Sequence, residues 1–91
     1  MALLGFAFTK VALDFLSTIP AKQRVQVIKK AKSLQLNPHP QSSKQLKGRS
    51  TQMGEPIYRE RSGDYRILYL VRENPGEVII LDIGHRKDVY R

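Results

Sequence analysis

The 91-residue sequence contains no cysteine, only two histidines and half as many acidic as basic residues. Without cysteine, the chain can form neither a disulfide scaffold nor a thiolate metal site. The histidines, His39 and His85, are far apart in the chain and make no convincing metal cluster. We therefore predict no metal ion and no cofactor, and we expect folding to depend on apolar burial alone.

The sequence also lacks a recognisable targeting or membrane-spanning segment. Met1–Phe8 is apolar, but it has no charged region before it, and Lys10 and Asp14 interrupt the apolar character that follows. This pattern supports neither a signal peptide nor a membrane span. We expect a cytoplasmic protein with no membrane partner.

A chain of 91 residues is near the lower end of the sizes that bury a self-sufficient core. We predict one domain, residues 1–91, built from a single sheet with one layer of helix packed on it. There is no room for a separate regulatory domain.

The sequence contains few acidic residues, and this imbalance of charge indicates which class of partner the protein binds. Sixteen Lys and Arg residues against eight Asp and Glu residues give a net charge of +8, which attracts polyanions. Residues 1–43 contain six basic side chains and only Asp14 as an acid, whereas residues 44–91 contain ten basic and seven acidic side chains. Nucleic acid is the leading class of partner.

Hydrophobic periodicity predicts a strand over Leu3–Thr9, a short helix over Lys10–Ser17, and a second helix that begins at Pro20. Apolar residues of the second helix recur at spacings of three and four, at Val25, Val27, Ile28, Ala31 and Leu34. Basic residues take its other positions. They are typical of the solvated side of a core helix, and a direct role in RNA binding is the alternative.

The second half of the chain reads as a loop followed by three strands. Gln41–Gly54 is polar, and we expect a loop that carries the cations Lys44, Lys47 and Arg49. His39, between two prolines, is more typical of a turn than of a catalyst. The strands are predicted over Pro56–Arg61, Asp64–Arg72 and Glu77–Ile83. The fold class is therefore α+β, in the order β-α-α-β-β-β, with an antiparallel sheet and both helices packed on one face.

Alternation along the strands brings several arginines together. Arg66 shares a face with Leu68, Leu70 and Arg72, and a tight turn at Ser62–Gly63 would place Arg59 or Arg61 close to it. Such cations suit an anionic ligand. The alternative is that acids neutralise them as surface pairs, through Glu55, Glu60, Asp64, Glu73 and Asp88.

The last residues add further groups that could meet RNA. Arg86 offers a planar fork of donors for phosphate, Tyr90 a flat surface for a base, and His85 a proton that can move near neutral pH. Lys87 and Arg91 would guide RNA in. The alternative for the whole tail is solvated charge, and for His85 a ring at a strand end that points to solvent.

Three stretches resemble the RelE branch of the RelE/ParE toxin superfamily. They are Leu46–Gly48, the hairpin Tyr58–Tyr69 and the ending Ile83–Arg91, and with the order of elements they extend the resemblance over essentially the whole chain. The motifs Gly-Asp-Tyr-Arg and Gly-His-Arg-x-x-Val-Tyr-Arg are fairly specific when they occur together.

This resemblance implies a toxin of a toxin–antitoxin pair that cuts mRNA in the ribosomal A site without a metal. Arg66 and Arg86 match the family arginines that hold the scissile phosphate, and Tyr90 matches the tyrosine that stacks on a base. Where the best-studied branch has two lysines, this chain has Ile57 and Arg59. A guanidinium effectively never loses its proton, so Arg59 makes a poor general base and His85 a better one on chemical grounds.

The resemblance also implies a cognate antitoxin. The chain ends at Arg91, soon after the motif, and we expect one face of the sheet to be incompletely covered. An acidic amphipathic segment would fit such a basic, partly apolar face and form a hetero-oligomer. Two other functions stay open: a ParE-like, non-enzymatic poison of DNA gyrase, which shares the fold, and an RNA-binding protein without catalytic activity.

Overall fold

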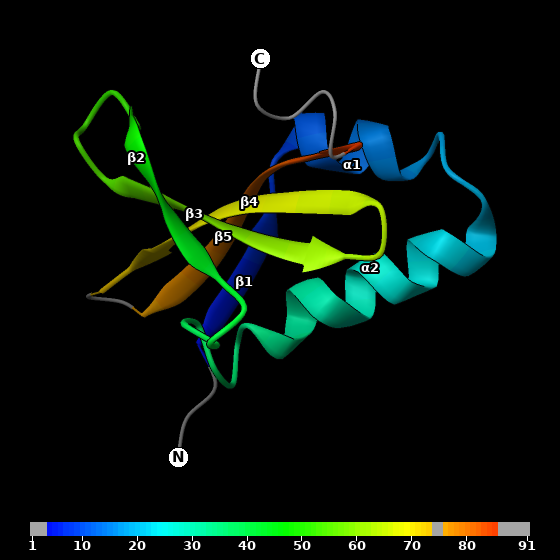
Figure 1. Cartoon of the computed structure of the whole chain (residues 1–91), viewed down its shortest axis with the longest axis horizontal. Helices are drawn as coiled ribbons and strands as arrows, with labels where there is room; N and C mark the ends of the chain where they lie inside the picture. Colours follow the sequence, from blue (N-terminus) through cyan, green and yellow to red (C-terminus); the bar gives the residue numbers. More distant parts are fainter. Residues whose placement is uncertain (1–3, 74–75, 86–91) are drawn as a thin grey trace.

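The computed structural model describes residues 4–73 and 76–85 (Figure 1). Two helices precede most of a five-stranded sheet. The predicted α+β class is confirmed, with the helices between the first strand and the rest. The elements are β1 (Gly5–Phe8), α1 (Lys10–Leu16), α2 (Ala21–Ser33), β2 (Lys44–Ser50), β3 (Pro56–Ser62), β4 (Tyr65–Arg72) and β5 (Glu77–His85).

The two helices begin in different ways. Thr9 caps α1, because its side-chain oxygen accepts a hydrogen bond from the Ala12 N–H at 3.2 Å. Pro20 stands at the N-cap of α2, where its missing N–H costs nothing. Arg24 then joins the two helices, since its Nε donates to the Leu16 carbonyl at 2.8 Å and its second guanidinium nitrogen donates to the Ile19 carbonyl at 3.0 Å.

The strands are arranged in the order β1-β5-β4-β3-β2, so that β1 and β2 form the two edges (Figure 1). β1 runs parallel to β5, and every other neighbouring pair is antiparallel. A parallel pair needs a crossover connection. Here the chain crosses from β1 through α1 and α2 to β2 at the opposite edge, and returns through β3 and β4 to β5. The predicted meander β3-β4-β5 is confirmed, with a parallel strand added at one side.

The segment that we expected to be a loop contains a strand. Lys44–Ser50 pairs with β3 as β2. The sequence hides this strand because β2 is an edge strand that is largely exposed, so it shows no apolar alternation. Gly48, with a φ of 72°, lies where the register shifts between Gln45 and Ser50. An exposed edge can therefore form from residues whose composition is typical of a loop.

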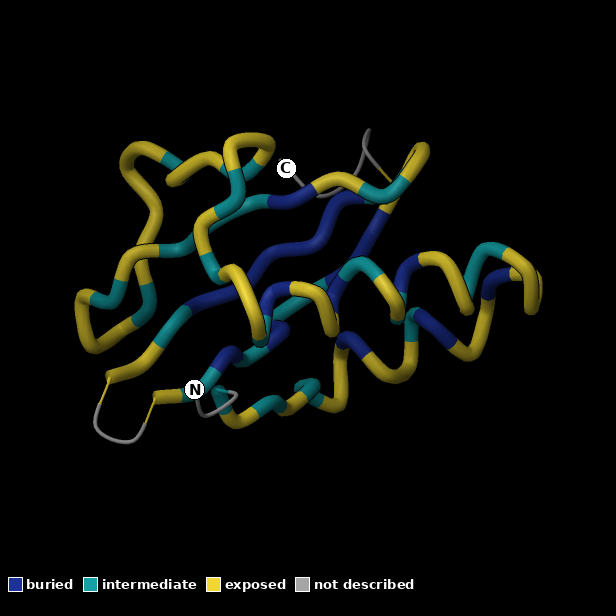
Figure 2. Tube along the Cα trace, turned by 90° about the horizontal axis from the view of Figure 1, so that it is seen from below, coloured by how far each residue is buried: buried dark blue, intermediate teal, exposed yellow. Residues whose placement is uncertain are grey.

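The core lies between the helices and one face of the sheet, which we call the first face. Ile67 and Tyr69 of β4 are fully buried there, together with Ile80 and Ile83 of β5. In Figure 2 the buried parts of the central strands run through the middle of the molecule. From the helices the core receives Ala12, Leu16, Val27 and Ala31, with Ile19 and Leu34 at their ends.

The other face of the sheet, which we call the second face, carries the alternate side chains of the same strands. Arg66, Leu68, Leu70 and Arg72 of β4 lie on it, as the alternation predicts. Leu68 and Leu70 are only 4% and 1% exposed, although neither belongs to the core cluster. The second face thus has an apolar centre between charged ends.

A buried polar group fixes the segment that leads into β2. Glu60 is fully buried on the first face, where one carboxylate oxygen accepts a hydrogen bond from Ser42 Oγ and the other accepts from the Arg61 N–H, each at 2.8 Å. The hydroxyl of Tyr69 donates to the Pro38 carbonyl at 2.6 Å. These bonds tie residues 38–42 to the sheet and so position the start of β2.

Candidate functional site

The cations of β3 and β4 meet on the second face. Arg61 lies directly opposite Arg66, and Arg59 lies directly opposite Leu68. Residues directly opposite each other in an antiparallel pair have Cβ atoms about 4.5–5.5 Å apart, and like charges there are destabilising. Of the two predicted neighbours of Arg66, Arg61 is therefore the one directly opposite it, and an anion would relieve the repulsion between these two cations.

Arg66 is the most enclosed of these cations. Its residue is 8% exposed, and its Nε is buried without a hydrogen-bond partner in the described part of the chain. A buried donor that lacks an acceptor costs free energy, about 1–3 kcal/mol or more for a charged group. A phosphate oxygen is an acceptor that would recover this cost.

β2 and β5 extend this surface on both sides. Lys44 of β2 lies opposite Arg59, and Asp82 of β5 lies opposite Leu68. A single row therefore crosses four strands, in the order Lys44, Arg59, Leu68, Asp82. The neighbouring row contains Arg61 and Arg66. We call the four basic residues of the two rows, Lys44, Arg59, Arg61 and Arg66, the cationic face.

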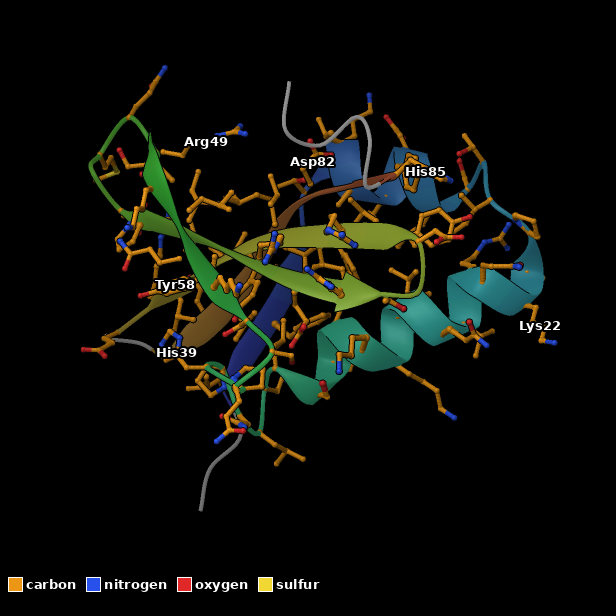
Figure 3. All side chains as sticks on the ribbon, in the orientation of Figure 1. Lys22, His39, Arg49, Tyr58, Asp82 and His85 are labelled. Atoms are coloured by element: carbon orange, nitrogen blue, oxygen red, sulfur yellow. The ribbon has the colours of Figure 1, made fainter. Side chains whose placement is uncertain are left out.

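The remaining basic residues of β2 lie beyond these rows. Lys47 and Arg49 are exposed, and Figure 3 labels Arg49 on β2. They lengthen the positive surface in the direction of the β2–β3 turn. The turn itself is closed by backbone hydrogen bonds between Thr51 and Glu55 and between Thr51 and Gly54, at 3.0 and 2.9 Å.

The two ion pairs that join described residues both involve Arg72, at the other end of the second face. Arg72 Nε lies 2.9 Å from a Glu55 carboxylate oxygen, and a second guanidinium nitrogen lies 3.9 Å from Glu77. The Arg72 guanidinium, through its hydrogen bond, lowers the pKa of the Glu55 carboxyl. Acids therefore neutralise Arg72, while Glu60 is turned to the first face.

His85 does not join the cationic face. It lies opposite Tyr65, and its ring contacts the Tyr65 ring with centroids 5.5 Å apart. Tyr65 in turn contacts Phe15 of α1, at 5.9 Å, which places both rings on the helix side of the sheet. Arg66 points to the opposite side. The structure thus separates His85 from the arginines with which the sequence grouped it.

The remaining sequence-based candidates fall into two groups. Arg86, Lys87, Tyr90 and Arg91, with Asp88, lie outside the described residues. His39 contacts the ring of Tyr58, with centroids 4.7 Å apart, in the segment before β2. It belongs to the first face through Tyr58, whose ring contacts Tyr69.

Asp82 is the one group of this surface that sequence analysis missed. The signal was present, because a carboxylate between Leu81 and Ile83 interrupts an otherwise apolar strand. Its face could not be read from alternation, since the register between β4 and β5 shifts here and skips Leu81.

Residues 4–73 and 76–85 enclose no pocket and contain no group of three or more metal-ligating side chains. Neither described helix is long and apolar enough to cross a membrane.

Solved structures with the same fold are toxins of bacterial and archaeal toxin–antitoxin pairs. The RelE–RelB complex of Pyrococcus horikoshii OT3 matches with a TM-score of 0.78 and 22% identity, over 97% of this chain and 100% of that one. RelBE2 of Mycobacterium tuberculosis matches with a TM-score of 0.76 and 27% identity, over 97% of both chains. Isolated E. coli RelE matches with a TM-score of 0.72 and 24% identity, over 96% of this chain and 90% of that one.

A search of curated proteins finds no significant match. A family model described as the ParE toxin of the type II toxin–antitoxin system parDE matches residues 7–90. This match spans both helices, the second half of β1, all of β2 to β5, and all but the last residue of the second motif. The chain therefore belongs to the ParE toxin family within the RelE/ParE superfamily, and its fold is that of the RelE toxins.

Proposed function

We propose that this toxin is an endoribonuclease that cuts mRNA in the ribosomal A site and so inhibits translation. The observation that carries the proposal is the enclosed guanidinium of Arg66, whose Nε is buried without an acceptor beside Arg61. A protein-binding surface has no need for a desolvated cation of this kind. A phosphate that gains charge during cleavage has such a need.

The chemistry requires no metal. In RNA cleavage of this type, the ribose 2′-hydroxyl attacks the adjacent phosphorus, and negative charge builds up on the non-bridging oxygens. Arg66 would stabilise that charge, with Arg61 beside it. Guanidinium groups suit this task because they stay charged and match two phosphate oxygens at once.

The resemblance to RelE toxins adds Arg86 as a second phosphate ligand and Tyr90 as a residue that stacks on a base. Lys44, Lys47 and Arg49, with Lys87 and Arg91, would contact the RNA backbone and the ribosome. Arg59 completes the cationic face but cannot accept a proton. His85 lies on the other side of the sheet, so its place as an acid or base lacks geometric support.

We further propose that a cognate antitoxin binds the second face and inhibits the toxin as a hetero-oligomer. The net charge of +8 favours an acidic amphipathic segment as the bound element. Such a segment would occupy the same surface as the RNA.

The second candidate function is a non-enzymatic poison of DNA gyrase. The description of the matching family as ParE toxins favours it. The two functions make different demands on the second face, because only the nuclease needs cations that converge on one phosphate.

Primer extension on a translated mRNA, with purified toxin and purified ribosomes, tests the proposal. We expect cuts that require the ribosome and that are lost in Arg86→Ala. Intact mRNA, together with double-strand DNA breaks when gyrase is supplied, would select the gyrase function instead.

A further inference from the structure

A nuclease of this type needs a group that takes the proton of the attacking 2′-hydroxyl. The group must be unprotonated at neutral pH, and it must lie on the same face as the phosphate ligand. The arginines of the cationic face are excluded as acceptors, because a guanidinium keeps its proton. Lys44 is exposed, and an ammonium group offers hydrogen-bond donors but no acceptor.

The acids and the histidine of the described residues leave one candidate on this part of the sheet. Glu60 and His85 lie on the first face. Glu55 and Glu77 lie beside Arg72, at the other end of the second face. Asp82 remains.

Asp82 is close to Arg66 by register. Arg66 lies opposite Gly84 and Asp82 lies opposite Leu68, so the two charged residues are diagonal neighbours on adjacent strands. Diagonal neighbours are about 7–8 Å apart at Cα, within reach of long side chains. Because Gly84 has no side chain, only Asp82 projects from β5 toward a phosphate bound at Arg66. Figure 3 labels Asp82 near the end of β5.

Asp82 is also available to react. Its side chain is partly exposed, and it forms no hydrogen bond or ion pair with the residues that the structure describes. Among the described residues, the charged side chains in the neighbouring rows of this face are basic: Arg66 from β4, Arg59 and Arg61 from β3, and Lys44 from β2. A carboxylate placed here can accept a hydrogen bond from a ribose hydroxyl.

We propose that Asp82 is the general base of RNA cleavage, an inference that rests on the proposed nuclease function. The 2′-hydroxyl gives its proton to the Asp82 carboxylate while its oxygen forms a bond to phosphorus. The bond between phosphorus and the 5′ oxygen breaks, and that oxygen takes a proton from water, while the hydroxide that remains takes the proton back from Asp82. The products are a 2′,3′-cyclic phosphate and a 5′-hydroxyl end, and Arg66 offsets the charge that builds up on phosphorus.

A purely electrostatic role for Asp82 predicts the opposite effect of mutation. A carboxylate beside an RNA phosphate repels it, so a neutral residue at position 82 would tighten RNA binding and preserve or raise the cleavage rate. A general base predicts a slower chemical step at undiminished affinity. The two roles therefore differ in the direction in which the rate changes.

Single-turnover cleavage on mRNA-programmed ribosomes, with toxin in excess, separates these effects. We expect Asp82→Asn to lower the saturating rate constant by about 100-fold or more, with no loss of apparent affinity. Asp82→Ser replaces the carboxylate with a hydroxyl and should lower the rate constant as much as Asp82→Asn does. Asp82→Glu keeps a carboxylate and should recover part of the rate. Glu77→Gln is the matched control, since it removes the same charge from the same strand at the far end of the face, and it should cleave like the wild type.

Each outcome decides the assignment. If the wild type cuts and Asp82→Asn or Asp82→Ser cuts equally fast or faster, Asp82 is not the base, while the nuclease function stands. If the wild type does not cut under any ribosomal condition, the nuclease function fails, and the assignment fails with it. Thermal unfolding of each variant confirms that a loss of rate is not a loss of fold.

Discussion

Arg61 and Arg66 lie directly opposite each other on β3 and β4, on the face of the sheet away from the helices. Two cations in this relation repel, and no acid joins either of them in an ion pair among the described residues. The toxin fold therefore keeps a destabilising pair where its proposed ligand binds. Substitutions at this site should therefore change both the stability and the activity of the protein.

The repulsion should be measurable as stability. We expect Arg61→Gln to raise the free energy of unfolding by about 0.2–1 kcal/mol, because one cross-strand like-charge pair is removed. Added salt should raise the Tm of the wild type more than that of Arg61→Gln, since salt screens the repulsion.

Arg72→Gln provides the comparison for this stability test, because Arg72 is paired with Glu55 at 2.9 Å. It should lower the Tm or leave it unchanged. A lower Tm for Arg61→Gln than for the wild type would show that an unrecognised contact compensates the arginine pair.

Basic residues of β2 should contribute to RNA affinity but not to sequence preference. Replacing Lys44, Lys47 or Arg49 with alanine should weaken binding to single-stranded RNA and reduce the slope of log K against log salt by about 0.7 for each phosphate contact that is lost. Fluorescence anisotropy over a range of salt concentrations measures both quantities.

Lys22→Ala is the matched control for the β2 variants. Lys22 is exposed at the start of α2, on the helix side of the sheet (Figure 3). Its removal should leave the salt slope unchanged. Equal effects of Lys22 and Lys44 would mean that net charge, and not the second face, attracts the RNA.

Tyr69 should make stability depend on pH in the alkaline range. Burial raises the pKa of the Tyr69 phenol above its ordinary value. The folded state then holds this proton more tightly than the unfolded chain does. Stability from this source is complete below the ordinary tyrosine pKa, about 10, and is lost as the pH rises from there through the folded-state value.

Ultraviolet titration of the four tyrosines checks this prediction. One of them should ionise later than the others, and Tyr69→Phe should remove that late step. If the late step persists in Tyr69→Phe, another tyrosine is responsible for it.

Much of this fold follows from sequence pattern. The alternation that put Arg66, Leu68 and Leu70 on one face is reproduced by the register, as is the approach of Arg61 to Arg66. These features depend on neighbouring residues of a tight hairpin, so local rules suffice to predict them. The predicted helices agree with α1 and α2 to within a few residues.

The features that were missed depend on distant parts of the chain. β2 exists because β3 supplies its partner, not because its own residues favour a strand. The face of His85 follows from β5 running two residues beyond the predicted end at Ile83, so that it pairs with Tyr65. Glu60 is buried because Ser42, from the segment before β2, donates to its carboxylate. Register and partners of this kind are not encoded in a single strand's pattern.

Cleavage by an Arg66→Ala variant tests the central claim most directly, with ribosome-bound mRNA as the substrate and primer extension as the readout. We expect the cut to be slowed by about 100- to 1,000-fold, as for other losses of a single stabilising group at a developing anion. Arg72→Ala, on the same strand and face, should cut like the wild type. Equal cutting by Arg66→Ala and the wild type would contradict the claim that the second face holds the scissile phosphate.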